Sequence, residues 1–230
     1  MKYLFAIGIT YCFIFFTGPA KAVYFDSIIY ELDANKDFLS KPIYNDTKQT
    51  NLYNIFAYKI RRPGDGNEGG VAESGKELMW SPLKFSVQPN GKEYFKLYYR
   101  GPEDNIERYY RVIFKEVPLT MSPYHARQKN TSIIPVVAMS TIFIVRPRKI
   151  DLKFEIDETK GLIRNTGNTF FRVIIQKGCN GDDESSKQFY MLPGETWYGP
   201  DAKANNRKYI VAQSRYHHLG EGCFNTDSIN

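Results

Sequence analysis

The sequence is poor in the residue types that carry most catalytic chemistry. It has three cysteines and three histidines in 230 residues, and Cys12 lies close to the N-terminus. No Gly-x-Ser-x-Gly elbow is present, and the glycines of 63–76 match no phosphate-binding loop. His125 falls in an expected polar loop, where a lone histidine is usually just solvated. The sequence therefore gives no support for an enzyme, and no cofactor is expected.

The excess of basic over acidic residues is also small. The chain carries 31 Lys and Arg against 25 Asp and Glu, a formal net charge of +6. The basic residues form no dense block, so nucleic acid is not expected as a partner.

Long apolar runs that could span a membrane are missing as well. The apolar stretch 3–16 follows Lys2 and precedes the small-x-small tripeptide Ala20-Lys21-Ala22, which is typical of an export signal. This stretch is short for a membrane span, and no later segment approaches the required length. We therefore expect residues 1–22 to be a signal peptide, with an uncleaved anchor as the alternative.

Two cysteines, Cys179 and Cys223, remain after the leader. In an oxidising compartment such a pair most simply forms one disulfide. Zinc bound with His217 and His218 is the competing interpretation, but the spacing matches no standard zinc pattern. A disulfide is therefore predicted, and no metal site.

Short alternating runs separated by turn signals dominate the rest of the chain. In 92–100 the residues Phe95, Leu97 and Tyr99 share one face, and 108–117 alternates in the same way. The turn residues 165–168 predict a hairpin between paired strands at 161–164 and 169–175. No segment after the leader has a convincing helical period. The fold class predicted is all-β, of the immunoglobulin-like sandwich type.

One long apolar run, 133–145, stands out from this pattern. The charged Arg146-Pro147-Arg148 follows it, and we place a domain boundary there, giving domains at 23–147 and 148–230. The run is compatible with a central strand buried on both faces. It is equally compatible with an edge strand that adds to the sheet of another protein.

Four segments of the chain resemble the fimbrial chaperones of the bacterial common pilus (Ecp type), distant relatives of the chaperone–usher pilus chaperones. They occur in the family's order and span most of the mature chain, and the family's second chaperone type shares the positions of both late cysteines. The segments are FKLYYRGPEDNIERYYRVIFKEVP (95–118), PVVAMSTIFIVRPR (135–148), GLIRNTGNTFFRVIIQKGC (161–179) and FYMLPGE (189–195).

The resemblance implies two immunoglobulin-like domains in a boomerang arrangement with a cleft between them. It implies a periplasmic chaperone that binds, folds and caps fimbrial subunits by donor-strand complementation and delivers them to the outer-membrane usher. Self-association through the donated edge is left open. The alternative is a structural or adhesive fimbrial component, but such a subunit should lack one strand, whereas this chain is expected to have two complete domains.

The resemblance also implies which residues are donated. Aligning Arg146-Pro147 with the family's matching dipeptide places one alternate set toward the subunit: Ile133, Pro135, Val137, Met139 and Thr141. The other set is expected to pack on the chaperone's own core: Ile134, Val136, Ala138, Ser140 and Ile142. An error of one residue in register would exchange the two sets.

One departure from the family concerns the subunit's terminal carboxylate. Related chaperones bind it with an Arg on the first strand and a Lys on the donor strand. Here the expected first strand, 23–32, has no basic residue, and the equivalent donor position is near Ile142. Arg111, Arg146 and Arg148 are candidate substitutes, because a guanidinium can bind a carboxylate through two hydrogen bonds. The alternative is that they are ordinary surface or linker arginines.

Overall fold

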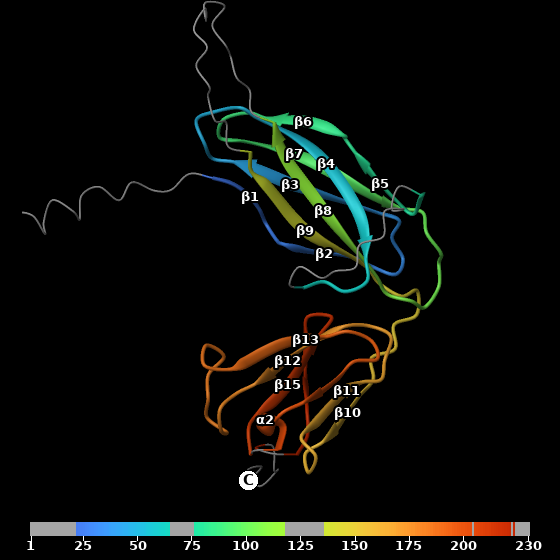
Figure 1. Cartoon of the computed structure of the whole chain (residues 1–230), viewed down its shortest axis with the longest axis vertical. Helices are drawn as coiled ribbons and strands as arrows, with labels where there is room; N and C mark the ends of the chain where they lie inside the picture. Colours follow the sequence, from blue (N-terminus) through green and yellow to red (C-terminus); the bar gives the residue numbers. More distant parts are fainter. Residues whose placement is uncertain (1–21, 65–75, 118–135, 204, 222, 224–230) are drawn as a thin grey trace, which may run out of the picture.

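The computed structural model describes residues 22–64, 76–117, 136–203, 205–221 and 223. Residues 1–21 of the predicted signal peptide (1–22), and Ile133, Ile134 and Pro135 of the apolar run, therefore lie outside the described residues. The chain is all-β within these ranges, as predicted, apart from the four-residue helix α2 (Pro200–Lys203). Figure 1 shows the strands before Arg146 and those after Lys149 as two groups joined by a short connection.

The N-terminal strands form two sheets. The first sheet has the order β1-β3-β7-β5: β1 (Val23–Phe25), β3 (Phe38–Asn45), β7 (Gly91–Tyr99) and β5 (Leu78–Ser81). The second has the order β2-β9-β8-β4-β6: β2 (Ile29–Leu32), β9 (Ala138–Val145), β8 (Arg108–Val117), β4 (Asn51–Ile60) and β6 (Lys84–Val87). We call these two sheets together the N-terminal sheet pair.

The C-terminal strands form a second pair of sheets. One has the order β10-β11-β14: β10 (Phe154–Asp157), β11 (Leu162–Asn165) and β14 (Thr196–Tyr198). The other has the order β13-β12-β15-β16: β13 (Lys187–Met191), β12 (Phe171–Ile175), β15 (Lys208–Ala212) and β16 (Arg215–His218). We call them the C-terminal sheet pair.

Each sheet pair encloses its own hydrophobic core. The predicted alternation of β7 is confirmed, because Phe95 and Leu97 are fully buried and Tyr99 is nearly so. Phe114 of β8 packs against Phe95, with the ring centroids 4.8 Å apart. A second cluster around Phe171 and Ile210 fills the C-terminal sheet pair. The period-two pattern of the sequence therefore sets which side of each strand faces a core.

The predicted hairpin at 165–168 is wrong. β11 and β12 flank this turn, but they belong to different sheets, so the turn carries the chain across the C-terminal core. The buried Asn165 explains the crossing, since its amide donates to the backbone oxygens of Thr169 at 2.9 Å and Met191 at 3.1 Å. Its side-chain oxygen accepts the N–H of Gly167 at 3.1 Å. These bonds tie the turn to strand β13 of the opposite sheet instead of closing a hairpin.

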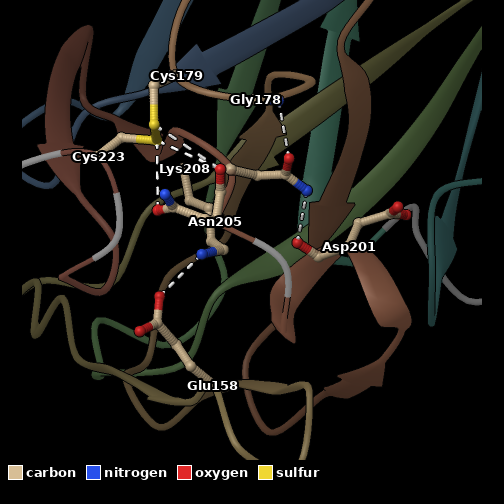
Figure 2. Close-up of a disulfide and its surroundings, with 8 residues drawn as sticks. Glu158, Gly178, Cys179, Asp201, Asn205, Lys208 and Cys223 are labelled. Atoms are coloured by element: carbon tan, nitrogen blue, oxygen red, sulfur yellow. Dashed lines mark hydrogen bonds and ion pairs between the residues drawn. A yellow bond between two sulfur atoms is a disulfide. The ribbon is translucent and has the colours of Figure 1, made fainter.

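The predicted disulfide between Cys179 and Cys223 is confirmed, with a Cα–Cα distance of 5.2 Å. It ties the segment that follows β16 to the loop after β12. Figure 2 shows Asn205 beside the sulfur atoms and the fully buried Lys208 pointing toward Glu158. The Lys208 ammonium donates to Glu158 Oε1 at 2.8 Å, so the buried charge has a partner.

Two further findings concern membranes and metals. In the described ranges no helix has the length and apolar character needed to cross a bilayer. The same residues contain no group of three or more His, Cys, Asp or Glu side chains placed to hold a metal ion.

Candidate functional site: the open edge of strand β9

Strand β9 contains the C-terminal part of the predicted donor run, and its two edges are covered unequally. On one side β8 pairs with all of it, from Ala138 to Val145. On the other side β2 pairs with it in parallel from Ile142 onward. In the part of the chain that the structure describes, no strand pairs with Ala138–Thr141 on this second side. β9 is thus a central strand over its last four residues and an edge strand over its first four.

The half-covered edge results from a break in the first strand. The sequence predicted one strand over 23–32, but β1 pairs with β3 in one sheet and β2 pairs with β9 in the other. Between them, the Ser27 hydroxyl accepts the N–H of Ile29 at 3.1 Å and donates to the Ile29 oxygen at 2.7 Å. The Tyr30 hydroxyl donates to Asp26 Oδ1 at 2.5 Å. These polar contacts hold the crossing, and β2 therefore begins too late to cover the start of β9.

The backbone groups of the uncovered segment point in alternating directions. The N–H of Ile142 donates to the Ile28 oxygen at 2.8 Å, which directs the even-numbered positions of β9 toward the β2 side. The oxygen of Val137 accepts from the N–H of Glu116 at 2.9 Å, which directs the odd-numbered positions toward β8. It follows from strand geometry that the N–H and C=O groups of Ala138 and Ser140 point to the open side. Unpaired groups of this kind are a template for another strand.

The side chains of this segment differ from the core-facing set predicted for it, while the identity of the donated residues stays a prediction. Met139 packs against the core of the N-terminal sheet pair, and Thr141 is fully buried in it. Ala138 and Ser140, predicted to pack on that core, are exposed instead. The physical reason is the pairing with β8, where Thr141 lies opposite Val112 and Met139 opposite Phe114, both core residues.

The chain just before β9 exposes two adjacent apolar side chains. Val136 is 50% exposed and Val137 is 51% exposed. In an extended chain they point to opposite sides. Contact of either residue with a partner stays a prediction.

Arg146, at the end of β9, lies in a buried network between the two sheet pairs. Its side chain is 4% exposed, and its guanidinium bonds to Glu31 Oε2 at 2.7 Å and Glu107 Oε2 at 2.8 Å. It also donates to the Thr169 hydroxyl and lies 4.2 Å from the centre of the Phe170 ring. Two carboxylates of its own chain therefore occupy the guanidinium of this predicted anchor.

Glu107 is the buried centre of this network. Its Oε2 also accepts the Thr169 hydroxyl at 2.6 Å, and its Oε1 accepts the backbone N–H of Phe170 at 2.9 Å and the hydroxyl of Tyr109. Burial, followed by the charge of Glu107, raises the pKa of Tyr109 far above its usual value, so this hydroxyl stays a donor. Tyr109 is a local partner, but Arg146 and Thr169 lie 39 and 62 residues further along the chain, so no local pattern in the sequence points to the role of Glu107.

The other two candidate arginines differ in their surroundings. Arg148 bonds to the backbone oxygen of Ala34 and lies 3.1 Å from Glu103, so it connects surface loops. Arg111 lies opposite Ile142 in the β8–β9 pair, and its Nη1 donates to the Ser140 hydroxyl at 3.2 Å. Arg111 is therefore the predicted anchor that borders the open segment of β9.

A small apolar pocket adjoins the covered half of β9. It has a volume of about 80 Å³ and lies where the two sheet pairs meet. Ile29 and Ile142 contribute from the N-terminal side, and Phe170, Tyr190 and Leu192 from the C-terminal side. Arg62, at its rim, is paired with Glu195 at 3.2 Å.

We predict that Arg146→Ala lowers the free energy of unfolding by about 3–5 kcal/mol, because it leaves the Glu107 carboxylate buried without its cation. Lys153→Ala is the control. The Lys153 ammonium lies 2.7 Å from Asp151 Oδ2, and the Lys153 side chain is 65% exposed. Exposed ion pairs contribute at most about 1 kcal/mol. Urea denaturation followed by tryptophan fluorescence measures both, since Trp80 and Trp197 report on different sheet pairs. Equal small losses in the two variants would contradict the structural role of Arg146.

Comparison with known proteins agrees with this architecture. No protein-family model matches the chain. The probable fimbrial chaperone EcpE of Escherichia coli (strain K12) is 35% identical over 207 residues, which cover 88% of this chain and 86% of that protein. The probable fimbrial chaperone EcpB of Klebsiella pneumoniae (strain 342) is 25% identical over 214 residues, which cover 92% and 94%. The solved structure of the class 5 fimbrial chaperone CfaA has the same fold, with a TM-score of 0.53 and 19% identity over 88% of this chain and 94% of that one. The chain therefore belongs to the family of the fimbrial chaperones EcpE and EcpB.

Proposed function

We propose that this protein is a periplasmic chaperone that binds, folds and caps fimbrial subunits by lending them strand β9, and then passes them to the outer-membrane usher. The observation that carries the proposal is the uncovered edge at Ala138–Thr141. The names of the relatives state the chaperone role. The edge supplies a physical means for it.

The proposed partner is a subunit whose β-sandwich lacks one strand. Such a subunit exposes an apolar groove and unpaired backbone groups, both of which promote aggregation. The open N–H and C=O groups of Ala138 and Ser140 can pair with the strand that borders this groove. The capped subunit then has a complete sheet, and the chaperone needs neither a nucleotide nor bond chemistry.

Two odd-numbered residues of the predicted donor set fit this arrangement. Val137 is half exposed, and Met139 is a partly buried member at the rim of the core. Because β1 crosses to the other sheet before β2 begins, a subunit that binds at this edge can continue the chaperone's core through Met139. Thr141 is enclosed in the free protein and contributes to that core from within.

We further propose the two-domain organisation that the family suggests, with immunoglobulin-like domains at 23–147 and 148–230 in a boomerang arrangement. The cleft between them then contains the small pocket beside Ile142. Arg111 is the proposed site for the subunit's terminal carboxylate, since it borders the open segment on the outward face of β8.

Ser140→Pro tests the edge directly. Proline removes the N–H that points to the open side and leaves the bonds to β8 intact, so the fold is retained. We expect at least about a tenfold loss of complex, from one lost backbone bond and the steric effect of the ring. The measurement is co-purification with the co-expressed major or tip subunit, followed by gel filtration.

Ser140→Val is the matched control for this variant. It also loses the hydroxyl that Arg111 contacts, but it keeps the edge N–H, and it should bind like the unchanged protein. Equal binding by the proline and valine variants would remove the edge from the mechanism. Incorporation of the protein itself into fibres would identify it as a structural fimbrial component instead.

A second pair of variants tests which side chains are donated. Val136 and Val137 are equally exposed neighbours just before β9 that point to opposite sides in an extended chain, so Val137→Asp and Val136→Asp form a matched pair. Burial of a valine contributes about 1.5–3 kcal/mol, so Val137→Asp should weaken the complex about tenfold or more, and Val136→Asp much less. The opposite ranking in the same co-purification would assign donation to the even-numbered face.

Arg111→Ala tests the proposed anchor. Loss of a charge-assisted bond to a carboxylate should reduce the yield of complex by about tenfold. Arg148→Ala, which removes an arginine bonded within the surface loops, should leave the yield unchanged. If neither variant lowers the yield of subunit, the carboxylate anchor is not an arginine of this set.

A further inference from the structure

Strand β16 is held on its sheet by little side-chain burial. In the described part of the chain it pairs with β15 alone, from Arg215 to His218. Three of its four side chains are exposed and His217 is half-buried, so none of them belongs to the core. Tyr216 and His218 contact the ring of Tyr209, but both stay exposed. A two-stranded hairpin is at best marginally stable by itself, so β16 depends on the chain that follows it.

The residues just after β16 supply that support. Leu219 is fully buried in the C-terminal core, and its N–H donates to the Lys208 oxygen at 3.0 Å. Gly220 follows with a φ of +80°, and a Cβ in its place would collide with Glu158 Oε1. The backbone therefore lies directly against the Glu158 carboxylate. We call residues 219–221 together with Cys223 the closing segment.

The closing segment lies beside a buried charge. Lys208 is fully buried, and its ammonium donates to Glu158 Oε1 at 2.8 Å. This is the same oxygen against which Gly220 packs. A buried ammonium is tolerated because it keeps its partner, and the closing segment shields this pair from water on one side. Removal of the segment would open both the ion pair and the core around Leu219 to solvent.

A disulfide fixes the far end of the closing segment. It joins Cys223 to Cys179, which lies in the loop after β12, across a sequence separation of 44 residues. Figure 2 shows the two sulfur atoms on the same side of the sheet as Lys208 and Glu158. Both cysteines are half-buried, so a dissolved thiol has access to the bond. Without this cross-link the closing segment gains conformational freedom.

We propose that the Cys179–Cys223 disulfide is a redox latch, which keeps the closing segment and β16 on the C-terminal sheet pair while it is oxidised. An external dithiol opens it by thiol–disulfide exchange. The S–S bond breaks, each cysteine sulfur ends as a thiol, and the two electrons and two protons come from the dithiol, which becomes a disulfide. Leu219 then leaves the core, and β15 becomes an edge strand.

The latch acts on one half of the molecule. The chain from Val23 to Arg146 contains no cysteine, so reduction leaves the N-terminal sheet pair and the open edge of β9 as they are. The proposal therefore does not depend on binding of a subunit. It makes the closing of the C-terminal half conditional on an oxidising compartment, which is where disulfides form and persist.

Hydrogen–deuterium exchange of the mature protein, read by mass spectrometry with and without dithiothreitol, tests the latch. We expect the amides of β16 and Leu219 to exchange about 100-fold faster after reduction, because they lose the cross-link that limits local opening. The amides of β4 and β8 should change by less than about twofold. Alkylation of the cysteines, measured by mass, verifies that reduction is complete.

The double variant Cys179→Ser, Cys223→Ser is the matched control. Without reductant it should show the exchange pattern of the reduced protein, and dithiothreitol should then have no further effect. Reduction of the folded protein needs no variant, so the test stands even if the double variant does not accumulate. Unchanged exchange in β16 after complete reduction would overturn the proposal. Equal acceleration in β4 and β8 would also overturn it, because it would show a general loss of stability.

Discussion

The break between β1 and β2 is the constraint on which the rest of the N-terminal half depends. If the first strand stayed in one sheet, it could cover the whole of β9 or none of it. Because the chain crosses between sheets around Ser27, it covers β9 from Ile142 onward. The four-residue strand β2 thus covers the edge of one half of β9 and leaves the edge of the other half unpaired among the described residues. The hydroxyl and carboxylate of two small polar residues, Ser27 and Asp26, set this division.

The two ends of β9 consequently differ in the number of contacts that hold them in place. Its C-terminal end runs into Arg146, which two carboxylates, a hydroxyl and an aromatic ring surround. Its N-terminal end has β8 on one side and open backbone groups on the other. The proposed binding at the open end would therefore leave the Arg146 network undisturbed and keep the position of the edge relative to the C-terminal sheet pair. A donated strand that is already positioned loses less conformational entropy on binding than a mobile one.

Alternation in the sequence predicted the strands whose two faces differ. In β7 and β8 the apolar and polar positions alternate, so the pattern alone places Phe95, Leu97 and Phe114 in the core, where they are buried. The run that includes β9 has no such contrast. Phe143 faces the core of the N-terminal sheet pair, while Ile142 and Ile144 face Phe170 across the junction between the sheet pairs. A strand buried on both faces is apolar at every position, and its pattern cannot say which residues point where.

The sequence failed to predict the structural role of Arg146 for a different reason. An arginine after an apolar strand has the chemistry of a carboxylate anchor, and the sequence does not reveal that Glu31 and Glu107 of the same chain already bind it. The pairing joins residues 115 and 39 positions apart, and no local pattern encodes such distances. The same limit applies to the turn at 165–168, whose polar composition indicates a turn but not the sheet to which the next strand belongs. Sequence patterns thus locate strands and turns here, whereas contacts between distant segments decide which arginine borders the open edge.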